Sequence, residues 1–387
     1  MNSSISNSKN KTFKRYLTAY FILLGIAVAT VVPNYFFLKN NGELLSLSSI
    51  VKIQVDSRSN LLYGTALHND TLSYKQYLFD SQKPEVAAVG SSRVMLFRKE
   101  FFKKSFINMG GATNSVTQGI ITATKMVNAD ENLKTVFIGV DFWWFNEKLE
   151  QTSQQAESQR ITVRKLLLPT KWLYEGKISK KDYFNRINPF YNHDNKNHIG
   201  VVANNNGSGF GPDGSYFYGN LFIGKQYSKS RIDKFLKQAE NGSGRFAYSN
   251  KMSQDRLDTF INMLKVFNSN EIRTIVFLTP VATSIANEMK IRQDKFNYVS
   301  EMRTAFEKNN VKFYDFLDPS FLGATDTEFY DGIHGSELTY ARILNYMYEH
   351  ECDLSNIIDI NQVRRYLENP DLINTLPYKN KTVSTFD

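Results

Sequence analysis

Five short apolar runs, separated by helix-length segments, constrain the fold of this 387-residue chain most strongly. The runs lie at residues 86–89, 105–109, 135–140, 273–279 and 311–316. Apolar runs of this length, bounded by turn residues, are typical of buried strands. Helical patterns follow them at about residues 93–104, 115–127, 254–267, 284–308 and 336–348. Strands that alternate with helices pair in parallel, so we expect an α/β fold, a three-layer sandwich with a five-stranded parallel sheet.

The alternation is interrupted between about residues 146 and 250, and we interpret this region as an insertion. Its composition is that of loops, with an Asn-, Gly- and Ser-rich stretch at residues 204–215. Aromatic residues flank this stretch, with Trp143 and Trp144 before the region and Tyr-Phe-Tyr at 216–218 within it. We expect an aromatic wall over the carboxyl edge of the sheet, with Trp143 and Trp144 binding substrate by stacking on sugar rings. The alternative is a local hydrophobic core beneath a long loop.

Residues 16–38 form an almost wholly apolar segment behind a basic, acid-free start at residues 1–15. About twenty such residues cross a bilayer as a helix, and positive charge before them places that end in the cytoplasm. We therefore expect a cytoplasmic tail at 1–15, a transmembrane anchor at 16–38 and an extracytoplasmic remainder. The alternative is a cleaved signal peptide, since Ala-Val-Ala at 27–29 is similar to a cleavage site. The apolar run continues to Phe36, which favours the anchor.

Composition narrows the classes of partner and cofactor. The net charge is +9, but the basic residues are scattered, without the dense run of a nucleic-acid-binding arm. We expect no nucleic acid, and rather an acidic membrane surface or a polyanionic glycan. The single cysteine, Cys352, excludes an intrachain disulfide. No zinc-type spacing, phosphate loop or dinucleotide glycine pattern is present, so we expect neither metal nor organic cofactor.

The first apolar run ends in a Gly-Ser-Ser turn at residues 90–92. Such a turn presents a hydroxyl at the carboxyl end of a parallel sheet, where open α/β sheets have their sites. A serine there is a weak nucleophile unless a histidine removes its proton. Ser92 is therefore a candidate nucleophile, and the alternative is an ordinary polar turn.

A histidine suited to this task lies far downstream, three residues after Asp331. In a turn, this spacing lets the Asp331 carboxylate reach one imidazole nitrogen of His334 and leaves the other nitrogen facing out. Asp331 would then fix the tautomer, while His334 acts as base and later as acid. The alternative for His334 is a helix-capping or surface histidine.

Together these motifs resemble those of the SGNH (GDSL-type) hydrolases. The Gly-Ser-Ser turn is similar to their first block, with Ser91 in place of the usual aspartate, and Asp331-x-x-His334 is similar to their last. Residues 108–114 and 138–142 lie where the second and third blocks are expected. The match covers roughly residues 85 to 350. Gly-Ser-Ser is a feature of the SGNH-like proteins that accompany membrane-bound O-acyltransferases, such as the D protein of teichoic-acid D-alanylation and the alginate O-acetylation proteins.

The resemblance implies a flavodoxin-like sheet and assigns three catalytic residues, Ser92, Asp331 and His334. It also implies an oxyanion site made of Ser92, Gly110, Gly111 and Asp141. The family has an asparagine in the third block where this chain has Asp141. A carboxylate repels a developing negative charge unless it is protonated or turned away, so backbone amides would have to hold the oxyanion.

Two functions follow as hypotheses. The first is acyl transfer, with acetyl as the expected group, or ester hydrolysis outside the membrane, on a cell-envelope polysaccharide and with a membrane-bound O-acyltransferase as partner. The second is a degenerate SGNH-like domain that binds glycan or partner without chemistry. In either case we expect a stalk at residues 39–84 and an SGNH-like domain at 85–387.

Overall fold

The computed structural model of the chain describes residues 2–56, 61–67, 70–151, 160–191, 197–219, 229–369 and 372. Its central sheet has five strands, all parallel. In spatial order they are β3 (Phe106–Gly110), β2 (Val86–Gly90), β4 (Thr135–Val140), β8 (Arg273–Leu278) and β9 (Phe313–Asp315). The predicted α/β class with a five-stranded parallel sheet is confirmed.

The order of the strands reverses at β2, which comes first along the chain. It pairs with β3 on one side, with Gly90 opposite Gly110, and with β4 on the other, with Val89 opposite Ile138. This is the flavodoxin-like order, and in such sheets ligands bind beyond the carboxyl ends of the strands at the point of reversal. The segment that begins at Ser91 leaves the sheet at this point.

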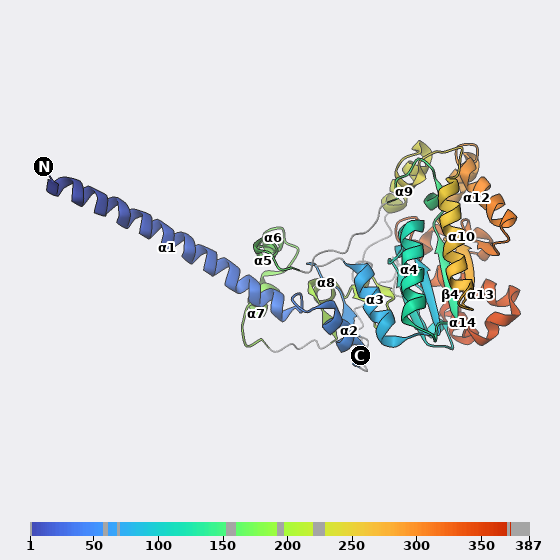
Figure 1. Cartoon of the computed structure of the whole chain (residues 1–387), viewed down its shortest axis with the longest axis horizontal. Helices are drawn as coiled ribbons and strands as arrows, with labels where there is room; N and C mark the ends of the chain where they lie inside the picture. Colours follow the sequence, from blue (N-terminus) through green and yellow to red (C-terminus); the bar gives the residue numbers. More distant parts are fainter. Residues whose placement is uncertain are drawn as a thin grey trace.

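Helices cover both faces of the sheet, which makes three layers (Figure 1). Ala87 and Val89 belong to the core under α4 (Val116–Ala129), α10 (Gln254–Asn268), α11 (Thr283–Ile291) and α12 (Asn297–Lys308). Val86 and Ala88 belong to the opposite core under α13 (Glu337–His350) and α14 (Ile360–Glu368). Alternate strand residues thus supply the two cores, as the two-residue period of a strand requires.

Two predicted helices differ from the observed structure. Residues 93–104 hold only the 3₁₀ helices η1 (Ser92–Val94) and η2 (Lys99–Phe101). Residues 94–97 are all buried, whereas a surface helix would expose one face. The helix expected over 284–308 is divided into α11 and α12, and buried Phe296 in the break packs against Tyr248 at a ring distance of 5.3 Å.

The region expected as a stalk is folded together with part of the insertion. It contains α2 (Leu47–Asp56), β1 (Leu62–Tyr63) and α3 (Thr71–Gln82). β1 lies in a small mixed sheet with three strands of the insertion, β5 (His198–Ile199), β6 (Gly209–Phe210) and β7 (Tyr216–Phe217). Buried Lys75 of α3 donates hydrogen bonds to the carbonyl oxygen of Asn108, at 2.7 Å, and to that of Gly214. One side chain therefore connects the stalk, the parallel sheet and the insertion.

The N-terminal helix α1 (Asn2–Asn40) is long and apolar, and residues 13–40 are long enough for a membrane span and contain an 18-residue window with a mean hydropathy of 2.1. Its described side chains are exposed from Phe13 to Ala29 and contact the rest of the chain from Thr30 onward. The contacts include three short helices of the insertion, α5 (Val163–Leu166), α6 (Leu168–Tyr174) and α7 (Lys180–Arg186) (Figure 1). Such a helix is consistent with a single-pass anchor or a signal sequence.

The remaining elements connect these parts. The insertion also contains α8 (Val201–Asn206) and α9 (Lys229–Asn241), and α9 packs on α11. Further 3₁₀ helices among the described residues are η3 (Phe142–Phe145), η5 (Gly244–Phe246), η6 (Pro319–Leu322), η7 (Asp326–Glu328) and η8 (Cys352–Asn356). The aspartate–histidine segment lies between η7 and α13, on the same edge of the sheet as the turn after β2.

Candidate active site

Ser92 is the partly exposed residue of the turn that follows β2. Its neighbours Ser91 and Arg93 are both buried, and Ser91 Oγ accepts a hydrogen bond of 3.3 Å from the Arg93 amide. That bond stabilises the tight turn from the strand into η1, as serine side chains commonly do at helix starts. The turn therefore points the Ser92 side chain out of the sheet edge.

The turn at residues 331–334 arranges the aspartate and the histidine. Asp331 Oδ1 accepts the amides of Ile333 and His334 at 3.2 and 3.1 Å. Gly332 lies between Asp331 and Ile333 and has a φ of +91°, a backbone conformation that glycine adopts without strain. The same carboxylate therefore holds the turn and reaches the imidazole.

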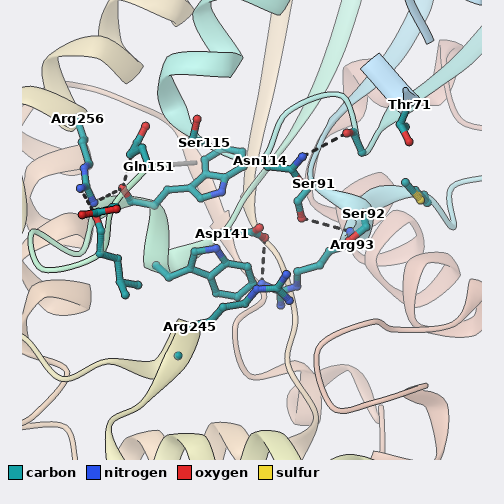
Figure 2. Close-up of a pocket in the computed structure, with 17 residues that line it drawn as sticks. Thr71, Ser91, Ser92, Arg93, Asn114, Ser115, Asp141, Gln151, Arg245 and Arg256 are labelled. Carbon is teal, nitrogen blue, oxygen red and sulfur yellow. Dashed lines mark hydrogen bonds and ion pairs between the residues drawn. The ribbon is translucent and has the colours of Figure 1, made fainter. Parts of the chain in front are cut away.

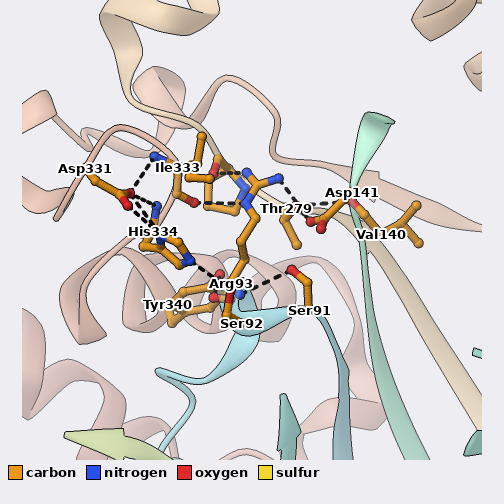
Figure 3. Close-up of polar contacts among 11 residues, drawn as sticks. Ser91, Ser92, Arg93, Val140, Asp141, Thr279, Asp331, Ile333, His334 and Tyr340 are labelled. Atoms are coloured by element: carbon orange, nitrogen blue, oxygen red, sulfur yellow. Dashed lines mark hydrogen bonds and ion pairs between the residues drawn. The ribbon is translucent and has the colours of Figure 1, made fainter. Parts of the chain in front are cut away.

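Serine, histidine and aspartate are connected by side-chain hydrogen bonds (Figure 3). Ser92 Oγ lies 2.9 Å from His334 Nε2. His334 Nδ1 lies 2.9 and 3.0 Å from the two carboxylate oxygens of Asp331. These distances lie within the range of a nucleophile, its base and an orienting acid. The structure thus brings together the three residues named as catalytic from the sequence.

The charge state of Asp331 suits an orienting role. Burial by itself would raise the pKa of this carboxyl group. The positive charge of protonated His334, the hydrogen bond from its ring and the two backbone amides outweigh burial and lower the pKa of Asp331 below its usual value. Asp331 is therefore ionised at neutral pH and can stabilise an imidazolium at His334.

A buried arginine, which the sequence analysis left without a role, anchors the histidine turn. Arg93 Nε donates to the carbonyl oxygen of Ile333 at 2.9 Å, and Nη2 donates to that of Pro280. The backbone oxygen of Arg93 accepts the hydroxyl of Tyr340 from α13. Since Arg93 directly follows Ser92, one residue fixes the histidine turn relative to this serine (Figure 3).

Asp141, predicted as an oxyanion group, is the ionic partner of this arginine. Its Oδ1 lies 3.1 Å from Arg93 Nη1 and accepts the Thr279 hydroxyl at 2.7 Å. Both partners of the ion pair are buried, with at most 1% of either side chain exposed. Burial lowers the pKa of Arg93, and the Asp141 carboxylate opposes this change. The carboxylate is thus turned toward Arg93, and an oxyanion role for Asp141 stays a prediction with no supporting contact.

The two predicted oxyanion glycines lie beside the serine turn but use their amides elsewhere. Gly110 N–H donates to Asn108 Oδ1 at 2.8 Å, and Gly111 N–H donates to the Gly90 oxygen at 3.0 Å. An oxyanion role for either amide would require one of these bonds to break. The Ser92 amide is at the first position of η1, where helix amides lack intrahelical partners.

A pocket of about 640 Å³ opens beside Ser92 (Figure 2). Its wall combines apolar surface with polar side chains, among them Thr71, Asn114, Ser115, Gln151 and Arg245. In the sequence, Asn114 was identified only as the last residue of the second block. Its Nδ2 makes a long bond of 3.4 Å to the Gly111 oxygen, so it can be drawn to a better acceptor.

Both predicted substrate-binding tryptophans line this pocket, in different ways. Trp143 is half-buried, and the guanidinium groups of Arg93 and Arg245 lie 4.9 and 5.2 Å from its ring. Trp144 is only 3% exposed, and its Nε1 has no hydrogen-bond partner among the described residues. Arg256 fixes the following loop through backbone oxygens, including that of Trp144 at 3.3 Å. Substrate binding by either tryptophan stays a prediction.

The aromatic residues of the insertion form part of a second pocket of about 340 Å³. Tyr216 and Tyr218 line it together with Tyr63 and Tyr74 of the stalk region. Thr71 and Met95 line both this pocket and the one beside Ser92. Phe217 points elsewhere and lies under the buried guanidinium of Arg98, 4.0 Å from its ring.

The sequence did not predict the roles of three residues of the site: Arg93, Asn114 and Thr279. The sequence does contain a signal for Arg93. Its basic side chain lies between the serine turn and an apolar run, and a possible acidic partner, Asp141, follows the third strand. Within the described ranges, no cluster of three or more His, Cys, Asp or Glu side chains is placed to hold a metal ion. Comparison with protein-family models and with curated proteins finds no match for the chain.

Proposed function

We propose that this protein is an extracytoplasmic, serine-dependent O-acyltransferase or esterase of the SGNH-like kind. One observation carries the proposal: the hydrogen-bonded series Ser92, His334 and Asp331 beside an open pocket at the carboxyl edge of a parallel sheet. A histidine within 2.9 Å of a partly exposed serine can remove its proton. The order of the sequence blocks resembles the order in that family and further supports the proposal.

In the first half-reaction, Ser92 Oγ attacks the carbonyl carbon of an acyl donor. The proton of Oγ passes to His334 Nε2, and the ionised Asp331 stabilises the imidazolium. When the tetrahedral intermediate collapses, the bond from carbon to the leaving oxygen breaks, and His334 returns the proton to that oxygen. The product is an acyl ester on Ser92 and a free alcohol.

In the second half-reaction, an acceptor hydroxyl attacks the acyl-serine. His334 takes the hydroxyl proton and returns it to Ser92 Oγ as the ester bond to the serine breaks. Transfer results when the acceptor is a sugar, and hydrolysis results when it is water. The wide pocket, with polar side chains beside the two tryptophans, would suit a sugar, which combines hydroxyl groups with apolar ring faces.

The oxyanion requires hydrogen-bond donors, and we propose the backbone amide of Ser92 and the side chain of Asn114. The Ser92 amide belongs to the attacking residue itself, at the start of η1. Asn114 shares the pocket wall with Ser92, and its Nδ2 holds its present acceptor only at 3.4 Å. Asn114 would supply the amide that the family places at the position of Asp141.

The acceptor and the partner follow from the resemblance and from the N-terminal helix. We propose a cell-envelope polysaccharide as acceptor, acetyl as the acyl group and a membrane-bound O-acyltransferase as the partner that delivers it. The apolar helix α1 is long enough to anchor the chain with its N-terminus in the cytoplasm. Such an anchor keeps Ser92 on the membrane side from which a lipid-embedded enzyme would supply acyl groups.

Covalent labelling tests the nucleophile directly. Purified full-length protein in detergent is treated with a fluorophosphonate probe, and the labelled peptide is identified by mass spectrometry. We expect the label on Ser92, and no labelling of Ser92→Ala. Ser91→Ala is the matched control, because it removes the adjacent, buried hydroxyl and should retain the label. Unlabelled wild type, or equal labelling of Ser92→Ala, would contradict serine chemistry at this site.

A second candidate is a binding module without catalysis. The engaged amides of Gly110 and Gly111, with Asp141 bound to Arg93, favour it because they leave few donors for an oxyanion. Cells lacking the native gene separate the two functions. If Ser92→Ala restores full glycan O-acylation at normal protein level, the binding module stands, and if it restores none, the enzyme stands.

A further inference from the structure

We propose that residues 160–191, here called the juxtamembrane cap, dock on an anionic lipid surface. The cap comprises α5, α6 and α7 and the residues that join them, and it surrounds the C-terminal end of α1 (Figure 1). The inference rests on the proposed anchoring by α1. It adds a second membrane contact that fixes how the catalytic domain sits above the bilayer.

The length of α1 puts the cap at the membrane surface. The exposed part, from Phe13 to Ala29, has 17 residues and is about 26 Å long at 1.5 Å per residue. The hydrocarbon core is about 30 Å thick and needs about 20 residues. If the core begins after Arg15, it extends to about Tyr35. The contacts of the cap with Asn34, Phe37 and Asn41 then lie at the outer end of this core and just beyond it.

Buried hydrogen bonds hold the cap firmly to α1. The side chain of Asn34 donates to Thr170 Oγ1 at 2.9 Å and accepts the Tyr183 hydroxyl at 2.8 Å. Arg186 Nη1 donates to Asn41 Oδ1 at 2.7 Å. Phe37 lies behind these bonds, with its ring 5.3 Å from that of Tyr183. The cap therefore cannot leave the bilayer surface without breaking a buried network.

Several large apolar side chains of the cap are exposed. Tyr174 and Phe190 are 93% and 92% exposed, and Val163 and Phe184 are 68% and 62% exposed. Leu167, four residues after Val163, is also exposed. Aromatic and aliphatic side chains at the level of the headgroups bury this surface in the acyl boundary. A lipid surface thus explains why the protein leaves these side chains uncovered.

The charge of the cap identifies the lipid class. It carries eight basic and two acidic side chains, a net charge of +6 out of +9 for the whole chain. The basic residues are Arg160, Arg164, Lys165, Lys171, Lys177, Lys180, Lys181 and Arg186. Of these, only Arg186 is buried. Exposed cations beside exposed apolar side chains are attracted to anionic headgroups, and this attraction falls with salt.

Lipid quenching in reconstituted full-length protein tests the proposal. In a Cys352→Ser background, Tyr174→Cys carries an environment-sensitive fluorophore in vesicles of phosphatidylcholine and phosphatidylglycerol with brominated acyl chains. We expect quenching several-fold stronger than for the same label at Ile291→Cys, which is exposed on α11 of the catalytic domain. Lys180→Glu with Lys181→Glu, or omission of phosphatidylglycerol, should weaken the quenching at residue 174.

Resistance to carbonate extraction, measured on the same vesicles, separates the cap from the anchor. If the chain resists extraction but the label at 174 is quenched no more than that at 291, the cap proposal fails and the anchor stands. If the chain is extracted, the anchor fails and the cap proposal with it. Quenching that is independent of phosphatidylglycerol overturns the recognition of anionic lipid. If the fluorophore at residue 174 reports a less polar environment only when a membrane protein is reconstituted in the same vesicles, the surface binds a protein and the lipid proposal fails.

Discussion

The guanidinium group of Arg93 and the carboxylate of Asp141 form an ion pair of 3.1 Å in complete burial, at the point where the strand order reverses. Because Arg93 also donates to the Ile333 oxygen, this pair connects the end of β4 to the turn that carries His334. The residue before Arg93 is Ser92. The geometry of the proposed nucleophile and base therefore depends on a charge pair that touches neither Ser92 Oγ nor the His334 ring.

We predict that Arg93→Met lowers both stability and activity. Removal of one member of a buried ion pair leaves an uncompensated charge, which costs about 3–5 kcal/mol of unfolding free energy. Arg93→Met with Asp141→Leu should recover much of the stability, because no charge remains buried. It should not recover fluorophosphonate labelling of Ser92, since the histidine turn has lost its anchor. Melting temperature and labelling rate measure the two effects, and normal labelling in Arg93→Met would refute the positioning role.

For Ser92 and His334, the proposed catalytic pair, we predict that the losses of activity on substitution do not add. Ser92→Ala and His334→Ala should each abolish nearly all ester turnover, and the double variant should lose no more than either single variant. A nucleophile and its base act as one unit, so removal of either disables both. Initial rates on a small acetyl ester and on the glycan provide the measurement. If the double variant loses the product of the single losses, the two residues act independently.

Asn114→Leu tests the proposed oxyanion donor. Loss of one such donor typically lowers kcat by about 10²–10³ and leaves KM nearly unchanged. Asn114→Asp should be as poor, because a carboxylate would repel the oxyanion. Steady-state kinetics on the acetyl ester distinguish this role from substrate binding, which would raise KM instead. Unchanged kcat in Asn114→Leu would remove this residue from the mechanism.

The sequence predicted those parts of the fold that depend on local pattern. The run at 135–140 coincides with β4, and the other four runs lie within one or two residues of their strands. The two-residue strands of the mixed sheet could not be predicted, because a pair of residues has no measurable period. The insertion was expected over the sheet edge, and its residues Gly244 and Arg245 do line the pocket beside Ser92, whereas its helices α5–α7 contact α1. That contact joins residues more than a hundred positions apart.

The site was predictable where its chemistry lies in short motifs. Asp331 and His334 are three residues apart, so the turn itself brings them together. Arg93 and Asp141 are 48 positions apart and meet only because parallel strands end at one edge. Asp141 therefore looked like an altered oxyanion residue in the sequence, whereas its contacts are those of an ionic partner.

The last prediction concerns Lys75, which is buried between the stalk, the sheet and the insertion. Burial lowers its pKa from the usual 10.5 to about 7, with the nearby Asp213 opposing the change. Between these two values the unfolded chain binds the extra proton and the folded chain does not. Stability attributable to Lys75 must therefore rise as the pH rises from about 7 toward 10.5.

Lys75→Met should remove this dependence. The variant leaves the carbonyl oxygens of Asn108 and Gly214 without their donor, so it is destabilised at every pH. The difference in unfolding free energy between wild type and Lys75→Met should increase from pH 7 to pH 10, by up to about 1.4 kcal/mol per pH unit. The difference between their melting temperatures should increase in the same direction. Lys52→Met, which removes an exposed lysine of α2, controls for the loss of one charge. If the curves of wild type and Lys75→Met are parallel between pH 7 and 10, Lys75 does not titrate in that range.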